Sequence, residues 1–296
     1  MSDAYSPRGR VGLLVPQANA VAEAEAAILL PAGVGLVTAR LVSGCAAMEA
    51  RLAEYFDAIG DTAARFGGMP LSAVGFACTG ASYPFDPADE DARIDAVSAR
   101  LGVPVVTAAQ AVSAALRALG ARRVALVSPY SDALTRASEG YWRARGFEVG
   151  QVARVTAAAG EAAAPGAHPI YALGDAALRR ALDTVDGAAA DAVVVLGTGL
   201  ASLPAIAATP RVGGAPVLSC MMALAWACAG RIGGGASSIP RWIEGDDWRG
   251  RLRARIGVDA VRPHDLAARI ADLIEPSART DLELPARDPI RPPPRL

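Results

Sequence analysis

Short apolar runs alternate along the chain with longer stretches in which apolar residues recur every three to four positions. The short runs predict strands buried on both faces, because half-exposed strands alternate polar and apolar residues. We expect strands at residues 11–15, 35–39, 73–77, 103–106, 123–127, 191–196 and 216–218. We expect helices at residues 20–29, 48–66, 90–101, 109–119, 131–145, 175–185 and 221–231. This alternation predicts an α/β fold in which parallel sheets are flanked by helices.

The pattern also occurs twice. Three landmarks appear in the same order in both halves, with residues 11–16, 78–80 and 102–107 resembling residues 124–129, 197–199 and 214–219. Apolar strand–helix units share a composition, so chance similarity is the alternative, but the common order favours an internal duplication. We expect two pseudo-symmetric lobes with the active site in the cleft between them. The predicted parts are a first lobe at 8–119 with 214–235 returning to it, a second lobe at 120–213, and a C-terminal extension with a proline-rich tail at 236–296.

The bulk composition is that of an ordinary folded protein. Hydrophobic residues make up 52% of the 296 residues and charged residues 20%, which excludes a disordered chain. The formal net charge of −1 gives no field that would attract nucleic acid or a membrane surface. The longest uncharged stretch lies between Arg211 and Arg231, but glycine and proline interrupt its start, so it predicts a buried strand and helix rather than a membrane span.

Cysteine and histidine usage limits the chemistry further. Four cysteines are too few for a disulfide scaffold and the N-terminus shows no secretory signal, so a reduced, cytoplasmic environment is the default expectation. Only two histidines are present, which disfavours a histidine-rich metal centre, and His168 lies in a segment typical of a turn. The sequence contains no phosphate-binding loop and no GxGxxG after a predicted strand. We therefore expect no metal and no cofactor.

Four segments follow predicted strands directly, at residues 16–19, 78–82, 129–132 and 197–200. In open α/β sheets, ligands bind outside the carboxyl ends of the strands. If the two halves face one another, these four segments surround one pocket. We expect the candidate site there.

Cys78 is the leading candidate for chemistry. It follows a strand and precedes Thr79-Gly80, where backbone N–H groups and a helix start would lower the pKa of its thiol. The alternative is a buried structural cysteine. Cys220 also follows a strand, but an apolar helix begins there and core packing is favoured; Cys45 and Cys228 are typical of packing residues.

The remaining candidates bind an anion. Thr79-Gly80 and Thr198-Gly199 offer backbone N–H groups that can hold a carboxylate or a developing enolate. Asn19 either caps the next helix or binds a substrate carboxylate. Tyr130 either donates its hydroxyl to the same anion or packs as a half-buried aromatic residue over the cleft.

Together these landmarks resemble the aspartate/glutamate racemase superfamily, within the branch of maleate cis-trans isomerase and arylmalonate decarboxylase. The resemblance covers about residues 8–235. Residues 16–25 are similar to the isomerase pattern Pro-x-x-Asn-x-x-x-Glu-x-Glu. Residues 197–206 are similar to the decarboxylase run Cys-Gly-Gly-Leu-x-Thr-Leu-Asp-Ala-Ile, and residues 217–219 and the helix containing Trp226 fit the same family.

The resemblance implies catalysis by cleft cysteines without a cofactor. Racemases and maleate isomerase have two facing cysteines, whereas arylmalonate decarboxylase has only the second-half cysteine. Here the pattern is reversed, because Cys78 occupies the first position and Gly197 leaves the second vacant. Thr79 and Tyr130 match the carboxylate-binding hydroxyls, but Gly80 replaces a serine. The second-half backbone donors would be Thr198 and Gly199. The resemblance also makes a homo-oligomer possible, since family members are often dimers or tetramers.

This cysteine pattern constrains the reaction. A two-base racemase needs proton-transfer groups on both faces, and Gly197 supplies none. Decarboxylation needs an anion site, an apolar pocket for the departing carboxylate and one proton donor, for which Cys78 suffices. Maleate isomerisation needs a nucleophile, which Cys78 would supply without an assisting second cysteine.

We therefore expect a small dicarboxylate substrate, with decarboxylation preferred, isomerisation as the runner-up, and a non-catalytic carboxylate-binding protein as a third possibility. In decarboxylation, Cys78 would protonate the face opposite to the one used by the known decarboxylase. The product would then have the opposite configuration, provided that the substrate binds in the same pose.

Overall fold

The computed structural model describes residues 4–158, 169–233, 235–245 and 247–257. These residues belong to one compact unit, Met1–Ala260. The predicted proline-rich tail and His168 lie outside the described residues. Among the helices of the described part, none is both long enough and apolar enough to cross a membrane.

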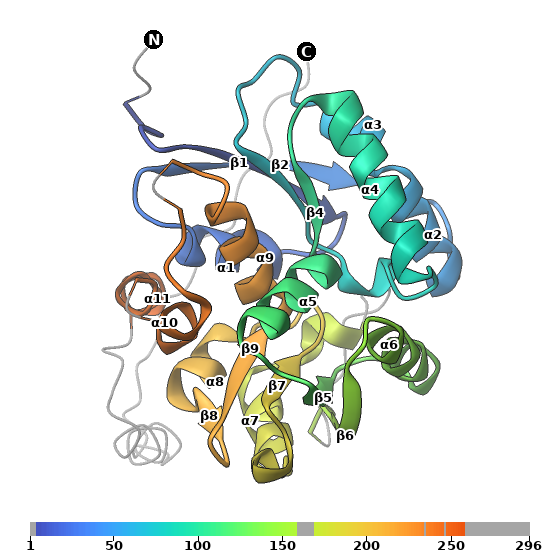
Figure 1. The fold of residues 1–296 in the computed structure, drawn as a ribbon, viewed down its shortest axis with the longest axis vertical. Helices are drawn as coiled ribbons and strands as arrows, with labels where there is room; N and C mark the ends of the chain where they lie inside the picture. Colours follow the sequence, from blue (N-terminus) through green and yellow to red (C-terminus); the bar gives the residue numbers. More distant parts are fainter. Residues whose placement is uncertain (1–3, 159–168, 234, 246, 258–296) are drawn as a thin grey trace, which may run out of the picture. The chain divides into compact units, whose positions relative to one another are not determined.

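Two sheets form the framework (Figure 1). The first is parallel, with the order β2 (Val34–Leu41), β1 (Gly9–Pro16), β3 (Ala73–Phe76) and β4 (Val105–Thr107). The second has the order β6 (Glu148–Arg154), β5 (Arg123–Ser128), β7 (Ala192–Val195), β9 (Ala215–Ser219) and β8 (Arg211–Val212), in which only β8 is antiparallel to its neighbour. This architecture confirms the predicted α/β class with two lobes.

Helices flank both sheets. The α-helices are α1 (Val21–Leu29), α2 (Met48–Asp57), α3 (Ile59–Ala64), α4 (Pro87–Leu101), α5 (Ala108–Ala118), α6 (Asp132–Ala144), α7 (Asp175–Leu182), α8 (Leu203–Ala208), α9 (Cys220–Ala229), α10 (Ile239–Glu244) and α11 (Arg249–Ile256). Single 3-10 turns are η1 (Thr79–Ala81), η2 (Pro169–Ala172) and η3 (Gly187–Ala189). Polar side chains cap the N-termini of several helices. The Thr107 hydroxyl accepts from the Gln110 N–H while the Gln110 side chain accepts from the Thr107 N–H, and the Ser219 hydroxyl caps α9.

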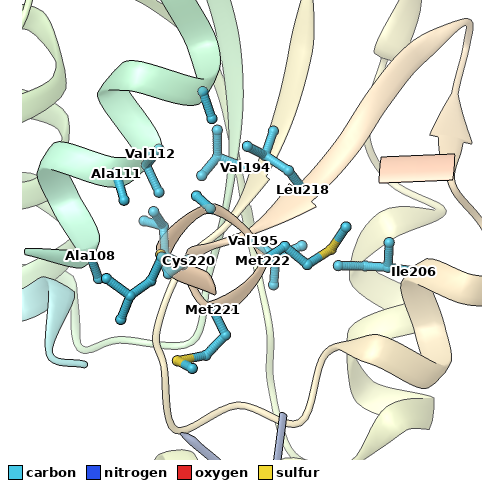
Figure 2. Close-up of a cluster of buried hydrophobic side chains, with 14 of the residues drawn as sticks. Ala108, Ala111, Val112, Val194, Val195, Ile206, Leu218, Cys220, Met221 and Met222 are labelled. Atoms are coloured by element: carbon cyan, nitrogen blue, oxygen red, sulfur yellow. The ribbon is translucent and has the colours of Figure 1, made fainter. Parts of the chain in front are cut away.

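Helix α9 connects the two halves. Its strand, β9, lies in the second sheet, whereas the helix packs against α1, α5, β3 and β4 of the first half. Residues 214–235, predicted to return to the first lobe, are thus divided between the two sheets; the lobe boundaries themselves stay a prediction. Figure 2 shows the start of α9, where Cys220 lies among Ala111 and Val112 of α5 and Val194 of β7. This apolar environment fits the core-packing interpretation of Cys220.

Some element boundaries differ from expectation. The single helix predicted at residues 48–66 is two helices, α2 and α3, which meet at Ala58 just before Gly60, a poor helix former. The edge strands β6 and β8, the short helix α8 and the helices α10 and α11 were not predicted. Strand β6 was not predicted because its exposed and half-buried residues, such as Glu148 and Gln151, give no continuous apolar run.

Candidate active site

A cavity of about 210 Å³ lies where the segments after β1, β3, β5 and β7 meet. All eight candidate residues from the sequence line it, namely Asn19, Cys78, Thr79, Gly80, Tyr130, Gly197, Thr198 and Gly199. The expectation that four segments after strands surround one pocket therefore agrees with the geometry. No group of three or more histidine, cysteine or acidic side chains suited to a metal occurs among the described residues.

Cys78 reaches the cavity from the end of β3 but is only 8% exposed. Burial raises the pKa of its thiol to about 12, although the backbone N–H of Ala81 donates to the sulfur and opposes the shift. The expectation of a lowered pKa is thus wrong, because η1 is a single turn and its one N–H does not offset desolvation. Cys78 is a neutral thiol at pH 7.

Gly197 occupies the corresponding place after β7, and its backbone is specialised. Its φ of +87° lies in the left-handed region that favours glycine. An added Cβ would come within 2.8 Å of Ile170 Cδ1 and 3.0 Å of Pro129 Cγ. The second-cysteine position is therefore not a vacancy into which a side chain would fit without rearrangement.

Cys220 lies behind Gly197, fully buried and outside the cavity lining. Burial raises the pKa of its thiol to about 11, while the Thr79 side chain and the Gly197 N–H lower it. A second thiol is thus present next to both loops, but it does not reach the cavity. Sequence reasoning placed Cys220 in the core and missed this contact with the site.

Thr198 and Asn19 join the two halves of the site. The Thr198 hydroxyl donates to Ala77 O (2.7 Å) and accepts from Asn19 Nδ2 (3.3 Å). Asn19 Oδ1 accepts from the N–H groups of Val21 and Ala22 at 3.0 Å. The amide therefore caps α1, one of the two roles considered for it, and keeps one N–H for a ligand. The Thr198 hydroxyl is already used within the protein.

The hydroxyl groups on the loop after β3 have fewer hydrogen-bond partners within the protein than the Thr198 hydroxyl has. Thr79 Oγ1 and Tyr83 OH are buried and form no hydrogen bond of full geometry with a described residue. The Tyr130 hydroxyl lies near both, and burial raises its pKa well above the usual value. Arg154 donates to Tyr130 O and thereby holds the backbone after β5 in place. Buried hydroxyls with spare capacity suit an anionic ligand.

Backbone donors complete the anion site. Neither the Thr198 N–H nor the Gly199 N–H donates to a described residue. Both residues line the cavity. Two such N–H groups can bind a carboxylate and stabilise an enediolate.

Glu25 supports the second loop from outside the cavity. Its carboxylate accepts from the N–H groups of Ser202 and Leu203 and from the Ser202 hydroxyl. Desolvation raises the pKa of Glu25 to about 7 despite these hydrogen bonds. Glu23 instead forms an ion pair with Arg40. Neither glutamate lines the cavity, which agrees with the interpretation that they are not acid/base groups.

Several lining residues were not identified from the sequence. They come mainly from α2 and η2 and comprise Gln17, Met48, Arg51, Leu52, Tyr55, Leu134, Ile170 and Tyr171. Arg51 and Tyr55 lie one turn apart on α2, a spacing that places both side chains on one face. That spacing was readable, but nothing in the sequence indicated that this face meets the cavity.

Solved structures with the same architecture have known activities. Maleate isomerase Iso from Pseudomonas putida S16 is 25% identical, with a TM-score of 0.65 over 78% of this chain and 98% of that one. Unliganded arylmalonate decarboxylase is 25% identical, with a TM-score of 0.60 over 78% and 95%. Maleate cis-trans isomerase from Nocardia farcinica, bound to TRIS, is 24% identical and shares the fold, with a TM-score of 0.60 over 79% and 98%.

The family comparison covers most of the chain. No curated protein matches it. The family model for arylmalonate decarboxylase matches residues 11–240. This result confirms the resemblance inferred from the sequence, and the homologues are enzymes, a lyase and an isomerase. The chain belongs to the arylmalonate decarboxylase family.

Proposed function

We propose that this protein is a cofactor-independent enzyme that acts on a small dicarboxylate through one thiol, in the manner of a carboxy-lyase. The observation that carries the proposal is the state of Cys78. Burial raises the pKa of the thiol to about 12, so Cys78 enters the reaction as a proton donor. Within the part of the chain that the structure describes, no acidic residue, histidine or second cysteine lines the cavity to share this role.

The arrangement supports the following steps. The N–H groups of Thr198 and Gly199 and the hydroxyl of Thr79 hold the retained carboxylate. The bond to the other carboxylate breaks, CO₂ leaves, and its electron pair forms an enediolate. Cys78 transfers its proton to the carbon, and the thiolate regains a proton from water. The apolar side chains of Leu52 and Leu134 offer the departing group a weakly polar surface.

Cis-trans isomerisation is the second candidate, because a thiol lines the cavity, although its raised pKa makes Cys78 a weaker nucleophile than a thiolate. The S–H group contains both atoms needed: sulfur adds to one carbon of the double bond and the proton to the other. Rotation about the resulting single bond and loss of the thiol return Cys78 unchanged. A mutant of Nocardia farcinica maleate cis-trans isomerase holds a covalently bound succinylcysteine intermediate. That protein is 23% identical to this chain.

Racemisation is not proposed. It needs a proton-transfer group on each face of the substrate, and the backbone at Gly197 does not accommodate one. A carboxylate-binding protein without activity is an outcome of the test below.

The test is a pair of incubations in D₂O followed by NMR. With 2-methyl-2-phenylmalonate, a carboxy-lyase releases CO₂ and gives 2-phenylpropanoate, whose configuration is measured by chiral chromatography. With maleate, an isomerase gives fumarate. The protein and a C78A variant are assayed side by side. CO₂ release that depends on Cys78 supports the proposal; fumarate alone supports the second candidate; neither product with either substrate contradicts both.

A further inference from the structure

Among the described residues, Arg51 is the one charged side chain in the cavity lining, and the steps above do not use it. It extends from α2 in the first half of the chain, whereas the free N–H groups of Thr198 and Gly199 come from the second half. No described aspartate or glutamate lines the cavity to neutralise it. A lone cation in a small cavity is an attractive site for an anionic group of a ligand.

The guanidinium of Arg51 is held in position by the protein. Its Nε and Nη2 atoms donate to Cys45 O at 3.0 and 2.7 Å. Its Nη1 donates to no described residue. The nearby Glu54 does not pair with it, because that carboxylate accepts from the Ser43 hydroxyl and the Cys45 thiol. Arg51 is therefore oriented by one pair of donors and keeps the remaining donors for a ligand.

Two phenols share this part of the cavity. Tyr55 and Tyr171 also line it; burial raises the pKa of both hydroxyls, and the charge of Arg51 opposes that shift. Gly199 is close to Tyr171, since a Cβ on Gly199 would meet Tyr171 Cε1 at 2.6 Å. The cation, the phenols and the backbone donors thus belong to one continuous cavity.

We propose that Arg51 binds the second carboxylate of the substrate through Nη1 and so selects dianions over monoanions. This inference rests on the dicarboxylate class of the proposed function. In isomerisation the contact persists in the product. In decarboxylation the contact belongs to the bound substrate and is given up before the carboxylate leaves across the weakly polar surface of Leu52 and Leu134, and the monoanionic product then binds more weakly and leaves. Arg51 is a specificity residue in either reaction.

The test measures binding without turnover, by calorimetry on a C78A background. The probes are matched pairs that differ by one carboxylate: maleate with (Z)-but-2-enoate, and 2-methyl-2-phenylmalonate with 2-phenylpropanoate. We expect R51Q to weaken dianion binding about 10- to 100-fold, the effect of losing a charge-assisted hydrogen bond, and to leave monoanion binding within about twofold. R51K should restore part of the difference.

The control is R93Q, which removes the same charge from an exposed ion pair with Asp57 on the outer surface. It should leave all four affinities unchanged. Equal weakening of both members of a pair by R51Q would overturn the proposal, since it would indicate that Arg51 only supports the segment at Cys45. An unchanged dianion affinity, or no binding of any probe to the C78A protein, would also overturn it. Arg51-dependent dianion binding without any turnover by the unmodified protein would support this inference while contradicting the proposed function.

Discussion

The loop after β3 and the loop after β7 occupy equivalent places in the two halves, yet they contribute different groups. The first presents side chains: the Cys78 thiol and a Thr79 hydroxyl with no full hydrogen bond to a described residue. The second presents backbone: Gly197 in a left-handed conformation, the free N–H of Gly199, and a Thr198 hydroxyl already bonded to Ala77 O. The absence of a cysteine at position 197 therefore goes together with a backbone conformation that does not suit a side chain there. Under the proposed function, the first loop supplies the reactive thiol and the second supplies the backbone donors of the anion site.

The largest expected effect comes from removing the reactive group of the first loop. C78A should lower kcat/KM by about 10²- to 10⁴-fold, the usual contribution of general acid catalysis. C228A removes a buried free thiol that does not line the cavity, and is the matched control. Steady-state assays with the substrate that is turned over provide the measurement. A C78A enzyme within tenfold of the unmodified protein would show that the first loop is not the reactive one.

Glu25 supports the second loop, and we expect this buried carboxylate to make the stability of the folded protein depend on pH. The folded-state pKa of Glu25 is about 7, above its ordinary value of 4.5, because burial disfavours the charged form. The folded protein then binds more protons than the unfolded chain between these values, so stability falls as pH rises from about 4.5 to 7. The full loss is about 3 kcal/mol. E25Q, which stays neutral, should remove this slope in urea unfolding measured across the range.

Glu23 provides the matched control for that experiment. It lies on the same helix but pairs with Arg40 near the surface, so E23Q should keep the slope. If E25Q and the unmodified protein showed the same pH dependence, the buried carboxylate would not hold the segment at Ser202 in the way described.

Much of this comparison was visible in the sequence. Apolar runs revealed the buried central strands, and the repeated Thr-Gly motif located both loops, because buried parallel strands and the turns after them leave strong local patterns. The conformation of Gly197 was not visible, since a glycine after a strand is compatible with many backbone angles. The predicted direction of the Cys78 pKa shift was wrong, because the burial that raises the pKa results from packing between segments far apart in the sequence. Arg51 was missed for the same reason: its role depends on which face of α2 meets the cavity.

The backbone conformation at Gly197 can be tested by introducing a side chain at that position. G197C should destabilise the protein by about 2 kcal/mol or more, from the left-handed backbone and from crowding against Ile170 and Pro129. G80A is the matched control in the first loop, because an added Cβ there meets Leu134 at an ordinary 3.5 Å. It should cost less than about 1 kcal/mol. Urea unfolding measures both, and equal costs would mean that the two loops are still interchangeable.

The smallest expected effect on stability distinguishes Thr79 from Thr198. T198V removes the donor to Ala77 O and the acceptor of Asn19 Nδ2, so it should cost about 1–3 kcal/mol of stability. T79V removes a hydroxyl with no full hydrogen bond to a described residue, so its stability should change by less than about 0.5 kcal/mol. Its effect should appear in substrate binding instead, as a higher KM or a weaker affinity of the C78A background for dicarboxylates. If T79V lost stability and kept its affinity, the Thr79 hydroxyl would be structural, and the division between a side-chain loop and a backbone loop would fail at that residue.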